Sequence, residues 1–475
     1  MTFVSDSTPN SGLVHDGAFT SLALVPELLN NLDSLGYHAM TPIQADSLPA
    51  MLAGHDVIAR AKTGSGKTAA FGLGLLSRIV VAQFRVQALV LCPTRELADQ
   101  VAGEIRRLAR SLSNVKVLTL CGGAPFGPQL ASLAHGAHVV VGTPGRVEEH
   151  LRKGSLSLDA LDTLVLDEAN RMLDMGFQAA MDAIVRETPN SRQTLLFSAT
   201  YSDDVRAIAE GLMRDPLTVE VAEAHDETTI QQHFYRVADE SARFESLRLL
   251  LLHYRPGASV VFCNTKRETD EVAGALSEAG FSALALHGDL EQRDRDRLLV
   301  LFSNRSASIL VATDVAARGL DIDALDAVFN YRIARELEVH VHRVGRTGRA
   351  GGHGVACTLV SEQEDYRLAR LGEFLQQQLD VEPLPSRRAL TGEPMIPAMV
   401  TLQLDGGKKQ KVRPGDILGA LTGDGGIRGD QIGKIKVLER SAYVAVQREV
   451  AQAALTQLSA GKLKGRSFRA RLVSR

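Results

Sequence analysis

The sequence predicts an α/β protein with two doubly wound parallel-sheet domains followed by a smaller α+β domain. Three observations predict this fold class. Short apolar, strand-like runs alternate with helical stretches along most of the chain, which is typical of parallel sheets covered by helices on both faces. A glycine-rich segment between one such run and a helix has the pattern of a phosphate-binding loop. The chain is also 475 residues long, which is too long for a single core.

The composition is that of a soluble, multidomain protein. Apolar residues make up 45% of the chain, enough to fill several cores. The N-terminus lacks a charged-then-apolar secretory pattern, and no apolar run approaches the roughly 18 residues that span a bilayer. We therefore expect a cytoplasmic protein without membrane contact. The four cysteines form no CxxC pair and stand in apolar runs, so we expect reduced core residues and no metal ligands: Cys92, Cys121, Cys263 and Cys357.

Charge is distributed unevenly along the chain. From residue 399 onward there are 15 Lys and Arg against 6 Asp and Glu, a net charge of +9. Since the whole chain carries a formal net charge of −3, the preceding 398 residues carry −12. A basic C-terminal domain on an acidic body indicates that this domain meets a polyanion, in particular nucleic acid. A basic surface that is merely solvated is the alternative.

The phosphate-loop segment lies in the first domain, after the apolar run 56–59 and before a helical stretch at 69–81. Its glycines let backbone N–H groups and a helix N-terminus converge on a polyphosphate, its lysine adds a positive charge, and its threonine offers a hydroxyl to Mg²⁺. We expect ATP to bind at these residues: Ala61, Lys62, Thr63, Gly64, Ser65, Gly66, Lys67 and Thr68. A glycine-rich turn that matches by chance is the alternative, because Ala61 stands where the pattern has its first glycine.

An acidic pair ends one predicted strand of the same sheet. We expect strands at 57–59, 88–92, 115–120, 138–141, 163–167 and 194–197, and ligands of such sheets bind beyond the carboxyl ends of the strands. Asp167 and Glu168 stand at such an end. Asp167 is predicted to hold Mg²⁺, and Glu168 to orient the water that attacks the γ-phosphate.

Further motifs precede the loop. Phe19, Tyr37 and the run Thr41-Pro42-Ile43-Gln44, together with the phosphate loop and the acidic strand end, resemble the DEAD-box family of ATP-dependent RNA helicases. The likeness runs from residue 19 to about residue 354 and implies two RecA-like domains, with ATP and Mg²⁺ as cofactors. It also implies that Gln44 reads the adenine edge while an aromatic ring, Phe19 or Tyr37, packs on the base. Simple core packing is the alternative for these two rings.

Other segments of the first domain match motifs that hold the RNA sugar-phosphate backbone in that family. Their glycines and helix starts suit phosphate contacts without base readout. The residues are Pro93, Thr94, Arg95, Gly122, Gly123, Thr143, Pro144, Gly145 and Arg146. Ser198, Ala199 and Thr200 resemble the segment that couples hydrolysis to strand separation.

One residue departs from the family pattern. The family's tetrad ends in aspartate, whereas this chain has Asn170, which we assign to coupling. Its carboxamide oxygen can still accept a hydrogen bond from Ser198 or Thr200, although the negative charge is absent. We expect hydrolysis to survive, and the efficiency of coupling is left open.

The second domain has the same alternation, with strands expected at 260–262, 283–287, 309–312, 327–330 and 356–360, but no phosphate loop. It must therefore act on nucleotide held by the first domain. Arg346 and Arg349 lie three residues apart at an expected helix end and are predicted to neutralise charge on the γ-phosphate. A merely basic helix end is the alternative. The resemblance assigns the remaining roles: ribose binding to Asp321, RNA binding to Gln292, Arg295 and Thr313, and coupling to His342.

The run 330–334 departs from the more acidic, proline-bearing stretch usual in the family, so we expect a change of local loop shape there.

The third domain reads as strand 400–404, helix 414–421, strands 435–438 and 442–446, helix 449–458 and strand 467–472, the order of an RNA-recognition-motif fold. Tyr443 is the one aromatic kept in a degraded RNP1 pattern. The other RNA-binding candidates are basic: Lys408, Lys409, Lys411, Lys462, Lys464 and Arg466. The runs 405–407, 413–424 and 432–435 resemble the C-terminal domain of bacterial DbpA helicases. That resemblance implies a substrate in 23S ribosomal RNA, a hairpin of the peptidyl-transferase region.

We therefore expect an RNA-dependent ATPase and helicase, monomeric, that unwinds short duplexes in assembly of the large ribosomal subunit. A nucleotide-gated RNA clamp with little unwinding is the alternative raised by Asn170, and a DNA helicase is disfavoured. The expected organisation is a flexible N-terminus at 1–18, a first domain at 19–217, a swinging acidic connector at 218–229, a second domain at 230–381, a linker at 382–398 and a third domain at 399–475.

Overall fold

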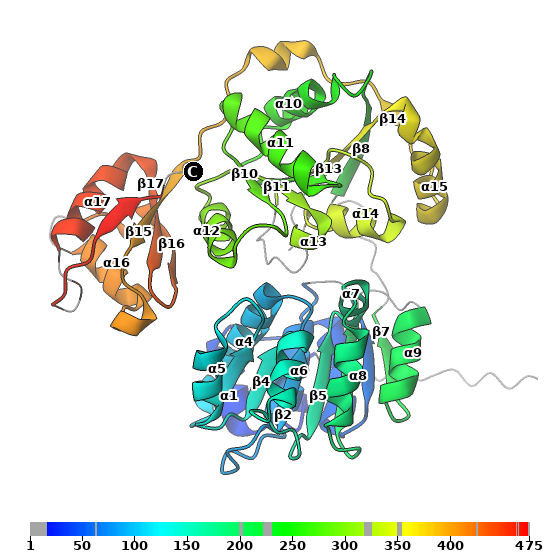
Figure 1. Cartoon of the computed structure of the whole chain (residues 1–475), viewed down its shortest axis with the longest axis vertical. Helices are drawn as coiled ribbons and strands as arrows, with labels where there is room; N and C mark the ends of the chain where they lie inside the picture. The colour runs from blue at the N-terminus through cyan, green and yellow to red at the C-terminus, as the bar shows by residue number, and fades with distance from the viewer. Residues whose placement is uncertain are drawn as a thin grey trace, which may run out of the picture. The chain divides into compact units, whose positions relative to one another are not determined.

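A computed structural model describes residues 17–61, 64–198, 203–221, 230–317, 325–348, 354–423, 426–461, 463 and 465–473. Those residues contain two seven-stranded sheets and one four-stranded sheet. The chain divides into two compact units: the first holds the first sheet, and the second, from residue 225 onward apart from 319–321, holds the other two sheets (Figure 1).

The first sheet has the strand order β3-β4-β2-β5-β6-β1-β7, and each of its strand pairs is parallel. This confirms the predicted fold class for the first domain. The strands are β1 (Val57–Arg60), β2 (Ala88–Leu91), β3 (Val117–Leu120), β4 (Val139–Gly142), β5 (Thr163–Asp167), β6 (Gln193–Ser198) and β7 (Leu217–Glu220).

Strand β7 corrects the prediction of a swinging connector that begins at residue 218. Thr218, Val219 and Glu220 pair in parallel with β1, and Val219 packs on the core, so this stretch is an edge strand of the first sheet. The sequence concealed it because a short edge strand with exposed residues lacks the apolar pattern of the buried strands. The rest of the predicted connector, residues 222–229, lies outside the described residues.

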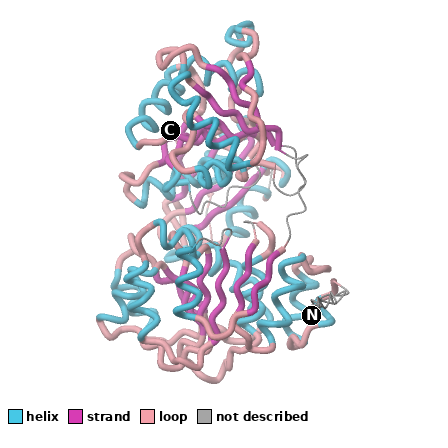
Figure 2. Tube along the Cα trace, turned by 90° about the vertical axis from the view of Figure 1, so that its right-hand side faces the viewer, coloured by secondary structure: helices cyan, strands magenta, loops and turns pink. Residues whose placement is uncertain are grey.

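Helices cover both faces of the first sheet, as Figure 2 shows. Alternate residues of each strand enter different cores: Val57 and Ala59 pack on one face and Ile58 on the other. Because both faces of the sheet are buried, residues that point either way are apolar, and the buried strands read as continuous apolar runs. The helices are α1 (Pro26–Ser34), α2 (Pro42–Leu52), α3 (Lys67–Leu76), α4 (Arg95–Leu108), α5 (Phe126–Leu133), α6 (Pro144–Arg152), α7 (Ala169–Asp174), α8 (Gln178–Arg186) and α9 (Asp203–Leu212).

The second sheet repeats this arrangement, with the order β10-β11-β9-β12-β13-β8-β14 and parallel pairs throughout. Its strands are β8 (Ile230–Arg236), β9 (Ser259–Cys263), β10 (Ala283–Leu286), β11 (Ile309–Thr313), β12 (Ala327–Asn330), β13 (Gly354–Val360) and β14 (Val381–Glu382). Its helices are α10 (Arg243–Tyr254), α11 (Lys266–Glu278), α12 (Gln292–Ser303), α13 (Asp314–Ala317), α14 (Leu337–Val344) and α15 (Asp365–Leu375).

Part of the segment predicted as a linker, 382–398, packs on the second sheet's core. Leu384 and Leu390 contact that core, and the side chain of Arg255 donates to the carbonyl of Glu393 at 3.3 Å. The prolines of this segment suggested a linker, but its two leucines are half-buried against the core to which α10 contributes.

The third sheet is antiparallel, with the order β16-β17-β15-β18. Its strands are β15 (Met399–Leu404), β16 (Ile432–Val437), β17 (Ala442–Gln447) and β18 (Ala470–Leu472), and its helices are α16 (Pro414–Thr422) and α17 (Ala451–Ala460). Residues of both helices and all four strands share one core. The order strand, helix, two strands, helix, strand confirms the fold predicted for the third domain.

No helix in the described ranges has both the length and the apolarity needed to span a bilayer. All four cysteines are free and buried, in agreement with their predicted place in the core.

Candidate nucleotide and RNA sites

The phosphate loop joins β1 to α3, as the sequence predicted. Gly64 and Gly66 have positive φ values of 89° and 94°, which glycine adopts without strain. A Cβ at Gly66 would also lie 2.5 Å from Nε2 of Gln44, so a side chain there would displace the Gln44 amide. Helix α3 begins at Lys67, so the N–H groups of its first turn point toward the loop. Lys62 and Thr63 lie outside the described residues.

A buried charge cluster connects the loop to the end of β5. Lys67 Nζ donates to the carbonyl of Ala61 at 2.9 Å and lies 3.6 Å from Oε1 of Glu168. Glu168 also lies 3.6 Å from Nε of Arg171, and its backbone is left-handed, with φ of 57°. A non-glycine residue in this conformation is strained, and such strain is found at functional sites. The loop lysine and the acidic strand end therefore share one site.

The carboxyl of Asp167 is buried at the end of β5. Burial, and secondarily the neighbouring Glu168 charge, raises its pKa to about 7. A bound cation stabilises the ionised form of a carboxyl in this environment. A carboxylate and one hydroxyl, such as that of Thr68, form a donor set that suits Mg²⁺, because this ion keeps several of its waters when it binds to a protein. Among the described residues, no three His, Cys, Asp or Glu side chains group as a metal site.

Gln44 contacts the loop directly. Its Nε2 donates to the carbonyl of Gly66 at 3.1 Å, while its Oε1 accepts from the backbone N–H of Thr41 at 2.9 Å. The Thr41 hydroxyl donates to the carbonyl of Ser65 at 2.8 Å. The start of α2 is thereby fixed to the phosphate loop, although the adenine contact of Gln44 stays a prediction.

Phe19 and Tyr37 contact each other edge to face, with ring centroids 6.4 Å apart. Phe19 is buried in the core, and the Tyr37 hydroxyl donates to Glu104 at 2.7 Å and accepts from Arg107 at 2.8 Å. These contacts favour the packing alternative for Tyr37, because its polar end is engaged on α4.

Asn170 accepts a hydrogen bond in the predicted way. Ser198 Oγ donates to Asn170 Oδ1 at 3.0 Å, and both side chains are buried. The departure from aspartate thus preserves the contact between α7 and the end of β6. Ala199 and Thr200 lie outside the described residues.

The RNA-binding candidates of the first unit lie at the carboxyl ends of β2, β3 and β4. Thr94 caps α4 by accepting from the N–H of Leu97 at 3.3 Å, and Arg95 pairs with Asp99. The N–H of Gly122 donates to the Thr143 hydroxyl at 3.3 Å. Gly122, Gly123 and Gly145 are exposed, and Pro93 and Pro144 are buried.

In the second unit a polar network surrounds Arg343 of α14. Its guanidinium pairs with both carboxylate oxygens of Asp314 and donates to Asn264 Oδ1 at 2.8 Å and to the carbonyl of Arg332 at 2.9 Å. Three residues further on, Arg346 is buried, and His342 is half-buried. The network fixes α14, which carries His342 and ends two residues before Arg346. Arg349 and Asp321 lie outside the described residues.

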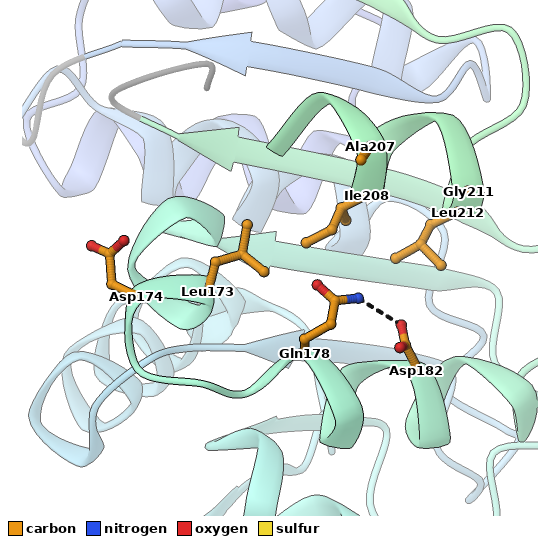
Figure 3. A pocket seen from close by; sticks show the side chains of 8 residues that line it. All are labelled: Leu173, Asp174, Gln178, Asp182, Ala207, Ile208, Gly211 and Leu212. Carbon is orange, nitrogen blue, oxygen red and sulfur yellow. Dashed lines mark hydrogen bonds between the residues drawn. The ribbon is translucent and has the colours of Figure 1, made fainter. Parts of the chain in front are cut away.

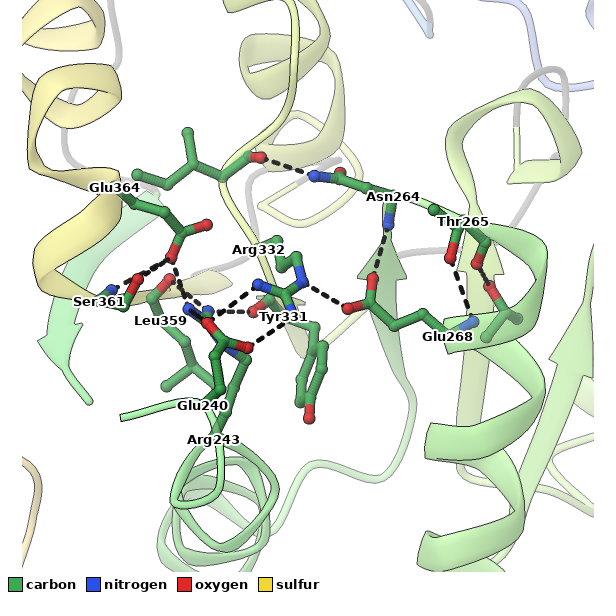
Figure 4. A network of polar contacts seen from close by, with 12 residues as sticks. Glu240, Arg243, Asn264, Thr265, Glu268, Tyr331, Arg332, Leu359, Ser361 and Glu364 are labelled. Carbon is green, nitrogen blue, oxygen red and sulfur yellow. Dashed lines mark hydrogen bonds and ion pairs between the residues drawn. The ribbon is translucent and has the colours of Figure 1, made fainter. Parts of the chain in front are cut away.

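Arg332, in the stretch that departs from the family pattern, belongs to the same network. Its side chain pairs with Glu240 and Glu268, and Glu268 Oε2 in turn accepts from the backbone N–H of Asn264 at 3.1 Å (Figure 4). Arg243 donates to Glu240 at 2.9 Å and to Glu364 at 2.6 Å. The unusual arginine is thus balanced by two carboxylates.

The remaining RNA candidates of the second sheet lie around α12. Gln292 donates to Asp296 at 2.8 Å, and Arg295 donates to the carbonyl of Ala316 on α13 at 2.8 Å. Thr313 ends β11 and is buried. Arg295 therefore connects α12 with the helix after β11.

In the third domain Lys408, Lys409, Lys411 and Arg466 are exposed, as binding to phosphates requires. Lys462 and Lys464 lie outside the described residues. Tyr443 is only 6% exposed, so the structure gives no support to its assignment as a stacking residue.

A cavity of about 420 Å³ lies elsewhere on the first unit, between α7, α8 and α9. Figure 3 shows apolar side chains such as Leu173 and Ile208 in its wall and a hydrogen bond of 2.8 Å from Gln178 to Asp182 at its side. None of the predicted site residues lines it.

Two functional candidates were missed in the sequence. Asn264 directly follows β9, so its place at the carboxyl end of a strand could have revealed it. Gln129 lies within α5, and no sequence signal indicates its contacts, which come from residues 8 to 21 positions away.

Family comparisons agree with this geometry. The DEAD/DEAH box helicase family matches residues 41–208, the helicase conserved C-terminal domain matches 242–351, and the DbpA RNA binding domain matches 401–472. The ATP-dependent RNA helicase DbpA of Escherichia coli is 55% identical over 457 residues, covering 96% of this chain and 99% of the relative. The chain belongs to the DEAD-box ATP-dependent RNA helicases, in the DbpA group. It is therefore an ATP-dependent RNA helicase with an RNA-binding domain.

Other DEAD-box helicases match about four fifths of the chain. CshA of Geobacillus kaustophilus is 42% identical over 379 residues, covering 80% of this chain and 81% of the relative. Among solved structures, Saccharomyces cerevisiae Dbp5 bound to RNA and ADP BeF3 matches with a TM-score of 0.70 at 31% identity, covering 77% of this chain and 96% of Dbp5.

Proposed function

We propose that this helicase is directed to 23S ribosomal RNA and acts in assembly of the large ribosomal subunit. The observation that carries the proposal is the similarity to E. coli DbpA, which extends through the third domain at 55% identity over 96% of the chain. Exposed lysines on that domain and its net positive charge supply the attraction to RNA phosphates. The cores that precede it grip RNA without reading bases, so specificity comes from the third domain.

The first unit binds ATP through the phosphate loop. Lys67 and the N-terminus of α3 neutralise the phosphates, and Gln44 reads the adenine edge. Thr68 and Asp167 hold Mg²⁺, which supplies charge neutralisation on the phosphates. Glu168, held in its strained conformation beside Lys67 and Arg171, orients the attacking water.

The second unit supplies Arg346 and Arg349, which neutralise charge on the γ-phosphate as hydrolysis proceeds. ATP and RNA each bind groups from both halves of the core, so binding of both favours a closed state. Closure bends one RNA strand and disrupts a short duplex, and phosphate release reverses it.

The protein works as a cytoplasmic monomer. Its first domain begins at residue 19, its second spans 230–381 and its third spans 399–475. These domain bounds are supported by the order of the sheets along the chain and by the residues that the family models match.

The alternative, an RNA clamp with little unwinding, rests on Asn170. The hydrogen bond from Ser198 to Asn170 favours coupling of hydrolysis to strand separation, because Asn170 keeps the acceptor oxygen that an aspartate would provide.

Steady-state ATPase rates with a 23S rRNA hairpin fragment, with unrelated RNA and with DNA test the proposal. We expect strong stimulation by the fragment, weak stimulation by unrelated RNA and none by DNA. Equal stimulation by both RNAs would contradict the 23S assignment. ATP-dependent RNA retention without strand separation would favour the clamp.

A further inference from the structure

Gln129 lies between the two loops of the first unit that follow β3 and β4. It is a polar residue of α5 with only 8% exposure. Its Nε2 donates to the carbonyl of Cys121 at 3.0 Å, directly before the glycine pair. Its Oε1 accepts from Arg146 at 2.8 Å and faces Nε2 of His150 at 3.2 Å. One buried carboxamide thereby joins three backbone segments.

The chemistry of these contacts requires an amide. Burial, and secondarily the Arg146 charge, lowers the pKa of His150, so the ring is neutral at pH 7 and carries one N–H. That N–H lies on Nε2 and donates to Gln129 Oε1, because an amide oxygen can only accept, while Nδ1 faces the Ser155 hydroxyl at 2.8 Å. The oxygen of Gln129 therefore serves two donors while its nitrogen serves one acceptor. Neither a carboxylate nor a thioether can do both.

Arg146, assigned from the sequence to RNA binding, is itself held by the protein. Its side chain is 12% exposed, pairs with Glu149 at 3.0 Å and donates to the carbonyl of Ala124 at 2.9 Å. It therefore spans from the start of α6 to the loop that contains the glycine pair. The N–H of Gly122 and the Thr143 hydroxyl form a second connection between the same loops.

We propose that Gln129 is a positioning residue for RNA: it fixes the loop at 122–124 relative to the start of α6 at 143–146 by holding Arg146 and the carbonyl of Cys121. The inference rests on the proposed function, in which these two segments hold RNA phosphates. Grip through backbone N–H groups and short side chains depends on loop placement, because such groups cannot adjust their reach as a long lysine can. A loss of placement therefore weakens RNA binding without touching the nucleotide site.

The test uses the full chain with Gln129→Met, which keeps the side-chain length and removes both hydrogen-bonding groups. ATPase activity is titrated with an unrelated single-stranded RNA, so that the core and not the third domain limits binding. We expect the RNA concentration for half-maximal activity to rise about tenfold, as loss of a buried hydrogen bond to a charged group implies. The KM for ATP and the thermal unfolding temperature should change little.

Gln178→Met is the matched control, because Gln178 bonds Asp182 beside the α8–α9 cavity (Figure 3) and should leave the RNA titration unchanged. Gln129→Glu keeps the acceptor for Arg146 and loses the donor to Cys121, so its loss should be intermediate. It also provides the test if the methionine variant fails to fold.

A double variant, Gln129→Met with Arg146→Met, separates positioning from general weakening. If Gln129 acts through Arg146, the double variant should bind RNA no more weakly than Arg146→Met alone. An unchanged RNA titration in Gln129→Met, or multiplied losses in the double variant, would overturn the inference. Failure of the proposed function would look different, since RNA would then fail to stimulate the unmodified protein.

Discussion

Lys67 Nζ lies 3.6 Å from Glu168 Oε1, and both side chains are almost completely buried. The phosphate loop and the acidic end of β5 are thus electrostatically coupled. A buried pair of this kind holds each partner in place, and ATP phosphates can compete for the lysine.

We therefore predict that Lys67→Ala reduces ATP hydrolysis on the order of 100-fold or more, because one fixed positive charge at the phosphates is lost. RNA binding by the third domain should persist, since its lysines lie in another unit. ATPase rates and RNA filter binding measure the two effects. Lys116→Ala, which removes a lysine bonded to the carbonyl of Ser132, is the control. Near-normal turnover in Lys67→Ala would refute the loop assignment.

Arg346→Ala should lower kcat far more than the affinity for ATP. A group that neutralises charge developing during reaction stabilises the transition state more than the bound substrate. Single-turnover hydrolysis and nucleotide titration give the two quantities. Arg335→Ala, at an exposed arginine of the same domain, should change neither. Equal losses in rate and affinity would instead identify Arg346 as a ground-state ligand.

Asn170→Asp should leave the ATPase rate within several-fold of the unmodified protein. Aspartate keeps the oxygen that accepts from Ser198, and Asp167 and Glu168 are unchanged. RNA-stimulated ATPase assays measure the effect. A rise of several orders of magnitude would mean that the natural protein hydrolyses poorly and works as the clamp.

How far the sequence predicts this molecule depends on whether a signal is local. The phosphate loop, the acidic end of β5 and the buried strands were predicted because each follows from neighbouring residues. Strand β7 was mistaken for part of a connector, because edge strands lack the apolar pattern.

Tertiary contacts explain the remaining differences. The hydrogen bonds of Gln129, and those between the Tyr37 hydroxyl and α4, join residues that are distant in sequence. The periodicity of apolar residues does not reveal such contacts. The burial of Tyr443 likewise depends on how the third sheet is covered. Arg332 was recognised as a departure, but its two carboxylate partners became visible only in the fold.

Those partners allow a charge-swap test. Arg332→Glu places three carboxylates together and should lower the free energy of unfolding by about 1 kcal/mol, a modest value because the arginine side chain is partly exposed. Adding Glu268→Arg should restore part of the loss. Chemical denaturation measures both. If the swap restores nothing, the ion pair contributes nothing measurable to stability.

Deletion of residues 399–475 should remove the preference for ribosomal RNA while keeping a low ATPase activity at high concentrations of generic RNA. The third domain has its own core and carries the basic surface, whereas the preceding domains contact RNA without base readout. On the proposed function, the domain holds one hairpin and thereby raises the effective concentration of neighbouring duplex at the helicase core. ATPase titrations with a 23S fragment and an unrelated RNA of equal length measure the preference.

The full chain with Lys408, Lys409 and Lys411 changed to Ala provides a matched control, because the third domain remains while three exposed charges are lost. Its affinity for the 23S fragment should fall, and the dependence of that affinity on salt should become shallower, since fewer counterions are released from the phosphates. If the truncated protein still prefers ribosomal RNA, or if the lysine variant binds with an unchanged salt dependence, specificity and phosphate contact reside in the first two domains.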